Sequence, residues 1–340
     1  MAGIRIEFAQ FGYFDSFDVI RSNSSMTGIA DNALPTPIAT GLKTMYYVDS
    51  DVVKGLTYYY KVRVWRNDIS FLSDEISALA GELWTPNQIA TFINLVADNS
   101  VINPSNLVSQ ITDSSGNNRN AVQSIDSRKP ILTTFGPLSQ KALQFDGSDD
   151  FLFISDTEYT KNKNSLWVFW VDQPTFKTAY TSVFYIVYNG FGGSKLNVSL
   201  NSGKTALGGR RTASDNYAEV TNSVNVSGQI GINFGQINFT LKTGWLFRDG
   251  VQSAVNSNLG TAGSSDAQGI YGSVMGAYVN SNAGASFSEG YIGKIGCVII
   301  GGGVLSIDDQ QRLEGWAAHK YGLTSKLASD HPYKTIPPIL

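Results

Sequence analysis

The sequence is poor in the side chains that form cross-links and metal centres. Its 340 residues include one cysteine, Cys297, and two histidines, His319 and His331. A single cysteine excludes an internal disulfide and a cysteine-based zinc cluster. Two histidines near the end of the chain exclude a histidine-rich metal centre. The fold must therefore be held together by packing alone, for which this length is ample.

Charged residues are scarce as well. They make up 16% of the chain, against roughly 25% in average globular proteins. The formal net charge is −3. Proteins that bind nucleic acids carry a basic excess, because lysine and arginine must neutralise phosphates. The charge balance therefore argues against a general nucleic-acid binder.

The sequence also lacks a long apolar run. The longest one, residues 295–305, contains four glycines and is too short for a bilayer, which takes about 20 residues. Residues 1–15 contain early acidic side chains and no apolar segment of the kind found in secretory signals. We therefore expect synthesis in the cytoplasm, no export by the usual route and no membrane insertion.

The residues that are abundant indicate β-structure. Hydrophobic residues make up 42% of the chain, with 18 Phe, 16 Tyr and 34 Gly. Aromatic side chains suit pleated sheets, and glycine supplies the positive φ angles of tight turns. The length fits two domains of about 100–200 residues each. We predict an all-β chain with domains at residues 1–81 and 82–340.

Apolar side chains alternate at period two through the first 80 residues, which predicts strands. In the clearest strand, Tyr58, Tyr60, Val62 and Val64 fall on one face. The surrounding segment VKGLTYYYKVRV, at 53–64, resembles the E–F corner of fibronectin type III domains. This resemblance implies a fibronectin III-like β-sandwich in which Tyr58 bonds to backbone upstream, as in a tyrosine corner. Other expected strands lie near residues 4–8, 14–19, 46–48 and 73–80.

Short strands separated by Asn, Ser, Gly and Asp continue through the second region, and their spacing predicts a sandwich of two large sheets. Residues 306–321 differ, since their apolar side chains recur at helical spacing. Ser306 can cap this helix at its start, with Asp309 in the first turn, and Gly322 can end it. An extended tail follows. The expected strands are 142–145, 151–154, 165–171, 182–188, 196–200, 228–234, 237–241, 245–248, 270–277 and 290–300.

Four motifs in this region occur in a recognisable order: LWTPNQI at 83–89, QITDSSGNNRNA at 110–121, ALQFDGSDDFL at 142–152, and residues 305–321 followed by DHPY at 330–333. Together they resemble concanavalin A-like (laminin-G-type) jelly-roll domains of phage structural proteins. The resemblance implies an all-β fold in which a fibronectin III-like sandwich is followed by a concanavalin A-like jelly-roll sandwich with one C-terminal helix.

The same resemblance implies a role in a phage virion, tail-associated or surface-displayed, after synthesis in the host cytoplasm. We expect several copies per particle, contacts between the N-terminal domain and other virion proteins, and attachment to host-surface glycans through the jelly-roll loops. Two alternatives remain open. One is a purely structural virion or decoration protein that makes protein–protein contacts, and the other is a polysaccharide depolymerase.

Asp146, Asp149 and Asp150 form the most concentrated polar cluster, on an expected turn. Three carboxylates can supply oxygen ligands to Ca²⁺. Asp and Gly are also ordinary turn formers. We favour the turn and expect no required cofactor, with Ca²⁺ at these three residues as the alternative.

Aromatic side chains near asparagine suggest a sugar site, because a ring can cover the apolar face of a sugar while amides bond its hydroxyls. Tyr188, Asn189, Phe191 and Tyr217 lie in loop-like sequence, and we predict these four as carbohydrate-binding residues. The alternative is that the aromatic residues only fill the core or pair across strands. The wider aromatic set consists of Tyr180, Tyr185, Tyr271, Tyr278 and Tyr291.

Catalytic motifs are absent from the sequence. Glycoside hydrolysis needs a carboxylate pair, and enzymes that share this jelly roll carry Glu-x-Asp-x-(x)-Glu on one strand, a run that does not occur here. Glu219 and Glu289 have no acidic residue two positions away. The nucleophile motif G-x-S-x-G is also missing. We therefore predict a protein that is not an enzyme and has no catalytic residues.

Overall fold

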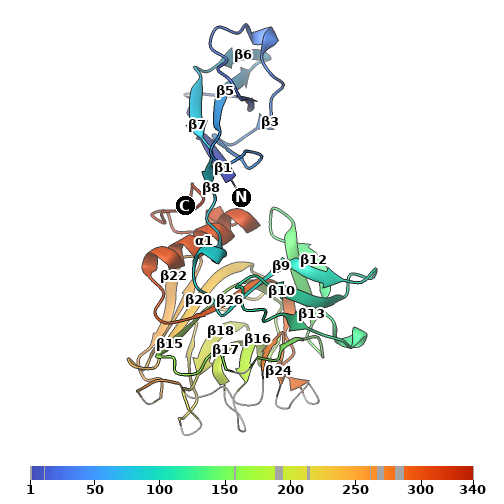
Figure 1. The fold of residues 1–340 in the computed structure, drawn as a ribbon, viewed down its shortest axis with the longest axis vertical. Coiled ribbons are helices and arrows are strands. Elements are labelled where there is room, and N and C mark those ends of the chain that lie inside the picture. The colour runs from blue at the N-terminus through green and yellow to red at the C-terminus, as the bar shows by residue number, and fades with distance from the viewer. Residues whose placement is uncertain are drawn as a thin grey trace. The chain divides into compact units, whose positions relative to one another are not determined.

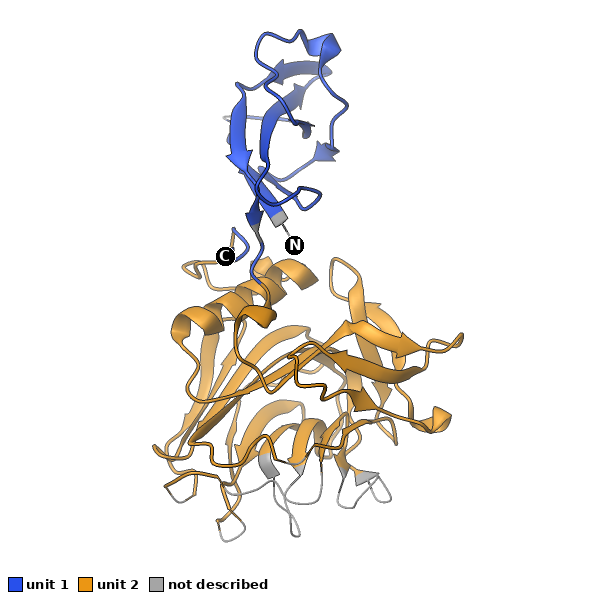
Figure 2. Ribbon diagram, viewed as in Figure 1, with its two compact units in different colours: residues 1–84, 336–340 blue, residues 85–335 orange. Residues whose placement is uncertain are grey.

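The computed structural model describes residues 2–10, 12–156, 158–187, 194–212, 215–260, 262–265, 272–279 and 287–339 (Figure 1). The chain divides into two compact units (Figure 2). Unit 1 comprises residues 1–84 and 336–340, and unit 2 comprises residues 85–335. The domain boundary expected after residue 81 precedes this division by three residues, and the last segment of the chain belongs to unit 1.

The described part of unit 1 forms two antiparallel sheets. One has the strand order β4-β1-β8, and the other has the order β3-β2-β5-β6 with β7 also paired to β5. Both sheets contribute to one core, in which Ile4 and Ile6 meet Val19 and Tyr60. The strands are β1 (Ala2–Glu7), β2 (Ser16–Ser22), β3 (Ala39–Leu42), β4 (Tyr46–Asp49), β5 (Thr57–Arg66), β6 (Ile69–Leu72), β7 (Ile76–Leu79) and β8 (Gly81–Glu82), with a 3₁₀ turn at η1 (Asp31–Ala33).

The alternation predicted for β5 is confirmed, because Tyr58, Tyr60 and Val62 are buried on one face of the strand. The hydroxyl of Tyr58 accepts a hydrogen bond of 2.9 Å from the backbone N–H of Val53, five residues upstream. This is the backbone contact expected of Tyr58. The buried ring of Tyr58 anchors the start of β5 in the core, and its hydroxyl holds the loop before the strand.

The end of the chain joins unit 1 through main-chain bonds. Leu83 forms an antiparallel bridge with Ile339, and the N–H of Trp84 donates to the Pro338 carbonyl at 2.9 Å. The extended tail expected after the helix is therefore held by backbone pairing in its last residues. Two prolines at 337–338 favour this extended conformation.

Among the described residues of unit 2, 16 strands form one continuous antiparallel sheet. Its main path runs β19-β18-β17-β16-β23-β14-β11-β10-β9-β26-β15-β20-β21-β22, while β12 and β13 pair beside β26. The bounds are β9 (Ile93–Ile102), β10 (Val108–Asp113), β11 (Ala121–Val122), β12 (Ile131–Phe135), β13 (Gln140–Asp146), β14 (Leu152–Ile154), β15 (Ser165–Pro174), β16 (Thr181–Val187), β17 (Ser194–Asn201), β18 (Lys204–Gly209), β19 (Ala218–Thr221), β20 (Gly231–Asn238), β21 (Thr243–Arg248), β22 (Val251–Asn256), β23 (Ser273–Met275) and β26 (Ile292–Gly302). A separate two-stranded ladder pairs β24 (Tyr278–Val279) with β25 (Phe287–Ser288).

The long sheet of unit 2 curls so that its two ends meet. β19 contacts β22, and β18 contacts β20 and β21. Leu207 of β18 packs onto the Gly235 backbone of β20, where an added Cβ would lie 2.9 Å from the leucine side chain. The core fills the space between the two halves. This sandwich of large sheets confirms the predicted all-β fold class.

One expected strand is wrong. The sequence predicted separate strands at 228–234 and 237–241, but β20 runs without interruption through Gly231–Asn238. Both halves pair continuously with β15, from Ser165↔Asn238 to Asp172↔Gly231. The prediction interrupted the strand at Gly235 and Gln236, whereas Gly235 marks the place where Leu207 of the opposite layer approaches the strand backbone.

The predicted C-terminal helix is confirmed as α1 (Ile307–Tyr321), the one α-helix in the ranges given above. The Ser306 Oγ accepts from the Asp309 N–H at 3.1 Å, and Gly322 ends the helix with a φ of 72°. Trp316 packs against Phe169 of β15 with ring centroids 6.5 Å apart. The helix therefore covers the outer face of β15, which explains why that strand is apolar on both faces. Shorter 3₁₀ turns are η2 (Pro86–Gln88), η3 (Asp126–Arg128) and η5 (Thr324–Lys326).

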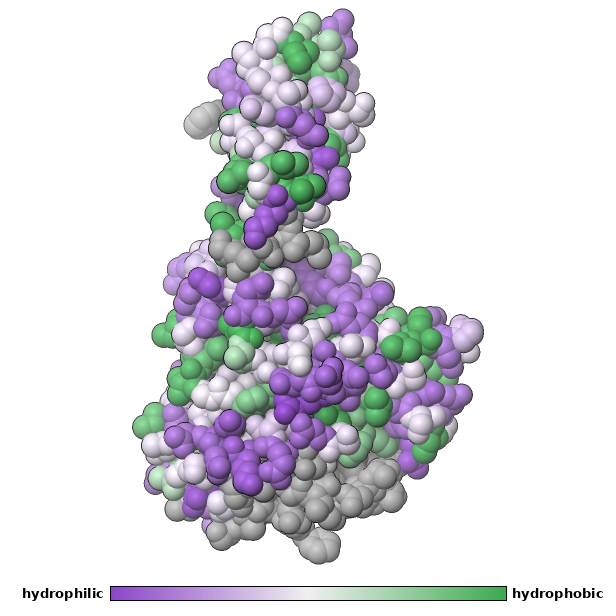
Figure 3. Space-filling view, viewed as in Figure 1, coloured by the Kyte–Doolittle hydropathy of each residue, from purple (hydrophilic) through white to green (hydrophobic). Residues whose placement is uncertain are grey.

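The surface of unit 2 is mixed in polarity. On the face drawn in Figure 3, hydrophilic residues surround scattered hydrophobic ones. No helix in the described ranges is both long enough and apolar enough to cross a membrane.

Candidate functional site

A cleft of about 390 Å³ opens on unit 2 and is the site where aromatic and acidic side chains gather. We call it the tyrosine cleft. Its side chains come from β16, β17, β19 and β24, from the residues that directly precede β16 and β19, and from the residue after β25. The lining residues are Tyr180, Tyr185, Asn197, Tyr217, Ala218, Glu219, Tyr278 and Glu289.

The floor of the tyrosine cleft is one row of residues that crosses four neighbouring strands. Tyr185 of β16 lies opposite Asn197 of β17, Asn197 lies opposite Gly208 of β18, and Gly208 lies opposite Glu219 of β19. Directly opposed residues in a sheet project to the same face. The next row along these strands projects to the other face and enters the core, through Phe184, Val198, Leu207 and Val220.

Gly208 makes room for the ring of Tyr217 in this row. A Cβ built on Gly208 would lie 2.1 Å from the Tyr217 hydroxyl oxygen. Tyr217 is 37% exposed, and its hydroxyl points to Glu219 Oε2 at 3.4 Å. Removal from water and the nearby Glu219 carboxylate raise the pKa of the Tyr217 hydroxyl, against a hydrogen bond from Asn197 that lowers it. The phenol therefore stays protonated at neutral pH.

Tyr185 and Tyr278 form one wall of the tyrosine cleft. Their ring centroids lie 4.5 Å apart with an interplanar angle of 80°. Tyr185 is buried, and burial together with Tyr278 raises the pKa of its hydroxyl. Val274 and Ala277 support the two rings from beneath. This edge-to-face geometry holds two aromatic surfaces nearly at right angles.

Glu289 is held in a costly backbone conformation. Its φ is +54°, a left-handed value that costs a non-glycine residue roughly 1–2 kcal/mol. The Ser182 N–H donates to its carbonyl at 2.8 Å, and the Ser182 hydroxyl donates to its carboxylate at 2.8 Å. Burial, and secondarily the charge of Glu219, raise the pKa of Glu289, while the Ser182 bond opposes this. The fold therefore fixes this carboxylate in the tyrosine cleft despite the strain.

Asn197 brings an unused acceptor to the same place. It is 7% exposed, and its Oδ1 has no hydrogen-bond partner among the described residues. An unsatisfied buried acceptor costs about 1–3 kcal/mol. Because the oxygen itself is buried, a ligand in the cleft reaches it only when neighbouring side chains move, and a donated hydrogen bond would then remove that cost.

The predicted sugar-binding residues and the wider aromatic set lie in different places in the structure. Tyr217 lines the tyrosine cleft, and so do three further members of the aromatic set, Tyr180, Tyr185 and Tyr278. Tyr188, Asn189 and Phe191 lie outside the described residues. Tyr291, in contrast, is fully buried and donates to Asp172 Oδ2 at 2.9 Å, so its role is in the core.

Asn197, Glu219 and Glu289 were missed as site residues. The two glutamates are 70 positions apart in the sequence (289 − 219), and neither has an acidic residue two positions away. The structure nevertheless places both in one cleft, where their charges interact. The sequence argument looked for a carboxylate pair on a single strand. It could not detect a pair that forms between β19 and the segment after β25.

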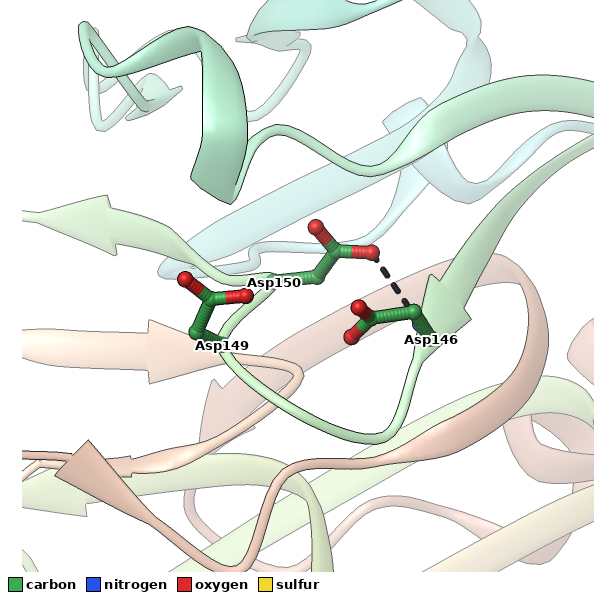
Figure 4. A group of neighbouring side chains, drawn as sticks. All are labelled: Asp146, Asp149 and Asp150. Atoms are coloured by element: carbon green, nitrogen blue, oxygen red, sulfur yellow. Dashed lines mark hydrogen bonds between the residues drawn. The ribbon is translucent and has the colours of Figure 1, made fainter.

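The Asp146, Asp149 and Asp150 carboxylates also come together, with ligand oxygens within 4.8 Å of one another (Figure 4). We call this the acidic turn. Asp146 Oδ1 accepts from the Ser148 N–H at 2.7 Å, and Asp150 Oδ2 accepts from the Asp146 N–H at 3.0 Å. Asp149 pairs with Arg128 at 4.0 Å. Burial and the charges of its two neighbours raise the pKa of Asp150 to about 7.

The two histidines pack against α1. His319 Nε2 donates to the Tyr333 carbonyl at 3.0 Å. His331 is buried, with Nε2 3.1 Å from Glu314 Oε2 and with Nδ1 accepting from the Tyr333 N–H. Both histidines therefore have local partners that join the tail to the helix.

Comparisons with known proteins give distant similarity in structure only. No protein-family model matches the chain, and no curated protein matches it. Among solved structures, the botulinum neurotoxin serotype C1 binding domain matches with 12% identity and a TM-score of 0.45, over 68% of this chain and 52% of that one. The chain thus spans about half of the toxin binding domain.

Two shorter structures match as well. The CBM40 of the Ruminococcus gnavus IT-sialidase, bound to α2,3-sialyllactose, has 15% identity and a TM-score of 0.36, over 44% of this chain and 82% of that one. The SAP-like pentraxin of Limulus polyphemus has 16% identity and a TM-score of 0.39, over 51% of this chain and 80% of that one. No functional residue is transferred from similarity at this level.

Proposed function

We propose that unit 2 binds a glycan in the tyrosine cleft and does so without catalysis. The observation that carries this proposal is the combination of four tyrosines with the unused acceptor of Asn197 in one cleft of about 390 Å³. A sugar ring has an apolar face that packs on an aromatic ring and hydroxyls that need hydrogen-bond partners. Ligand sites typically combine aromatic walls with a few placed polar groups in this way.

The wider role that we propose is attachment of a phage virion to its host, with the protein tail-associated or surface-displayed in several copies. The jelly-roll motifs of residues 83–152 and 305–333 support this context. Weak binding at each cleft would then add up across many copies. Unit 1 would contact other virion proteins, and its aliphatic and phenylalanine side chains that are at least 50% exposed suit such contacts: Val53, Leu56, Ile69, Phe71, Ile76, Leu79 and Ile339.

Glycan binding is tested with the full chain on an array of host-surface glycans. Tyr217→Ala removes one aromatic ring from the cleft. We expect at least roughly tenfold weaker glycan binding, because the contact between this ring and the sugar is lost. Tyr13→Ala is the matched control, because Tyr13 is a 63% exposed tyrosine in unit 1. Equal binding by wild type and Tyr217→Ala would place the glycan outside the tyrosine cleft, and no binding to any glycan would leave the purely structural alternative as the better account.

The two glutamates favour hydrolysis as a second candidate function. In that reaction a protonated carboxyl donates to the glycosidic oxygen while the C–O bond breaks, and a carboxylate takes a proton from the attacking water. Glu289, with its raised pKa, would be the acid, and Glu219 would be the base. Incubation with host capsule polysaccharide distinguishes the two functions. Binding alone leaves chain length unchanged, whereas shortening by wild type that Glu289→Gln abolishes would establish the depolymerase.

A further inference from the structure

Among the described residues that line it, the tyrosine cleft carries negative charge and no positive charge. Glu219 and Glu289 line it, and none of its eight described lining residues is Lys, Arg or His. The effective dielectric constant in such a site is well below that of water, so these charges act strongly on a bound ligand. An anionic sugar would be repelled by both carboxylates.

The hydrogen-bonding groups of the cleft also favour a ligand that is positively charged or rich in donors. The acceptors of the cleft include the two carboxylates and Asn197 Oδ1, which has no partner among the residues that the structure describes. Two of its donors are engaged, because the Tyr217 hydroxyl faces Glu219 and the Tyr185 hydroxyl bonds to Tyr278. The ligand that complements this cleft is therefore rich in donors. An ammonium group offers three donors and no acceptor.

The aromatic walls favour the same chemistry. A cation is attracted to the face of a tyrosine ring within about 6 Å of its centroid. The Tyr185–Tyr278 pair presents rings at 80° to each other, which forms the corner of an aromatic cage. Rings are not ligands for metal ions, and a cleft of about 390 Å³ far exceeds the size of one ion. The combination fits an organic cation rather than bare Ca²⁺.

We propose that the tyrosine cleft selects a glycan that bears a free amino group, such as a de-N-acetylated hexosamine, over neutral and anionic sugars. The ammonium group lies against Glu219 and Glu289, and the sugar ring packs on the tyrosines. This inference rests on the proposed glycan binding and specifies its ligand class.

The test is calorimetric titration of the full chain with three probes: a β-1,4-linked glucosamine tetramer, its fully N-acetylated counterpart and α2,3-sialyllactose. We expect the amino tetramer to bind roughly tenfold more tightly than the acetylated one, or better, because a charge-assisted contact is lost on acetylation. Sialyllactose should bind more weakly than either. The double variant Glu219→Gln/Glu289→Gln should bind the two tetramers with nearly equal affinity.

The control variant is Glu158→Gln, since Glu158 is an exposed glutamate of unit 2 outside the cleft. It should keep the wild-type preference, and thermal melts of all variants check that they are folded. Equal affinity of wild type for both tetramers overturns the inference and leaves glycan binding intact. Preference for sialyllactose also overturns it, and so does Ca²⁺ binding that the double variant abolishes. Failure of every probe to bind overturns both the inference and the proposed function.

Discussion

Unit 2 contains two groups of acidic side chains, the acidic turn and the tyrosine cleft, and they differ in what surrounds their carboxylates. In the acidic turn, three carboxylates lie within 4.8 Å of one another, and each has a hydrogen bond or an ion pair within the fold. The described lining of the tyrosine cleft has two carboxylates, which face a hollow of about 390 Å³ together with a buried amide oxygen that has no partner in the described part of the chain.

The difference shows what distinguishes a binding site from a structural motif. The number of carboxylates does not do so, because the turn has more of them. An open hollow with remaining hydrogen-bonding capacity does, because a ligand gains free energy by packing into the hollow and by bonding a group such as Asn197 Oδ1, which has no partner among the described residues.

The comparison predicts the largest effect for the pH dependence of stability in the acidic turn. Asp150 has its pKa raised from 3.8 to about 7, so the folded state holds its proton more tightly than the unfolded state. Its contribution to stability is complete below pH 3.8 and is lost as the pH rises through 7. The difference amounts to at most about 4 kcal/mol, at 1.36 kcal/mol per unit.

Asp150→Asn keeps the acceptor for the Asp146 N–H and removes the titration. We expect the variant to match wild type near pH 4 and to be more stable near pH 8, as measured by urea unfolding across this range. If the difference in unfolding free energy between variant and wild type is the same at all pH values, the folded state does not raise the pKa of Asp150.

The second prediction concerns the floor of the tyrosine cleft. Gly208→Ala places a methyl group where the Tyr217 hydroxyl lies, with a separation of 2.1 Å before adjustment. The ring must move, and we expect about tenfold weaker binding of the glucosamine tetramer, equivalent to about 1.4 kcal/mol. Gly81→Ala is the control, because its Cβ would meet nothing within 4 Å. Unchanged affinity in Gly208→Ala would place the ligand away from Tyr217.

A smaller effect is expected for the pH dependence of binding. Glu289 faces Glu219 and the four tyrosines of the cleft, and burial raises its pKa, which moves its protonation toward neutrality from the acidic side. Affinity for the amino tetramer should fall as the pH drops through this range, because Glu289 loses its charge. Glu289→Gln should give a flatter profile in the same titration, and an equally steep one would assign the pH dependence to another group.

The smallest effect is expected for Ca²⁺ at the acidic turn. Because its carboxylates already have partners, millimolar Ca²⁺ should leave the melting temperature of the chain unchanged. If Ca²⁺ raises the melting temperature and Asp149→Asn abolishes the increase, the acidic turn binds Ca²⁺, as the alternative drawn from the sequence expected. Bound Ca²⁺ would also reverse the pH dependence of Asp150, because a bound cation favours the charged carboxylate.

Local patterns in the sequence were enough to predict elements whose neighbours are close along the chain. The alternation of Tyr58, Tyr60 and Val62 located β5 and its buried face, and Ser306 with Gly322 located the ends of α1. These signals are short-range, since a strand face and a helix cap are set within a few residues.

The tyrosine cleft could not be predicted in the same way. Its floor depends on the register between four strands, and the sequence pattern did not identify β18 or β19. β19 has only four residues, and β18 ends in two glycines. Without these strands, nothing connected Tyr185 with Glu219. In retrospect, the signal was the polar position between core residues, Asn197 between Leu196 and Val198 and Glu219 before Val220.

The most direct test of this account is a crystal structure of the full chain soaked with the glucosamine tetramer. We predict density for a sugar ring in the tyrosine cleft, with its amino group within hydrogen-bond distance of Glu219 or Glu289 and a donor on Asn197 Oδ1. Density for the ligand at the acidic turn or elsewhere, with an empty cleft, would contradict the claim that unpaired groups mark the binding site.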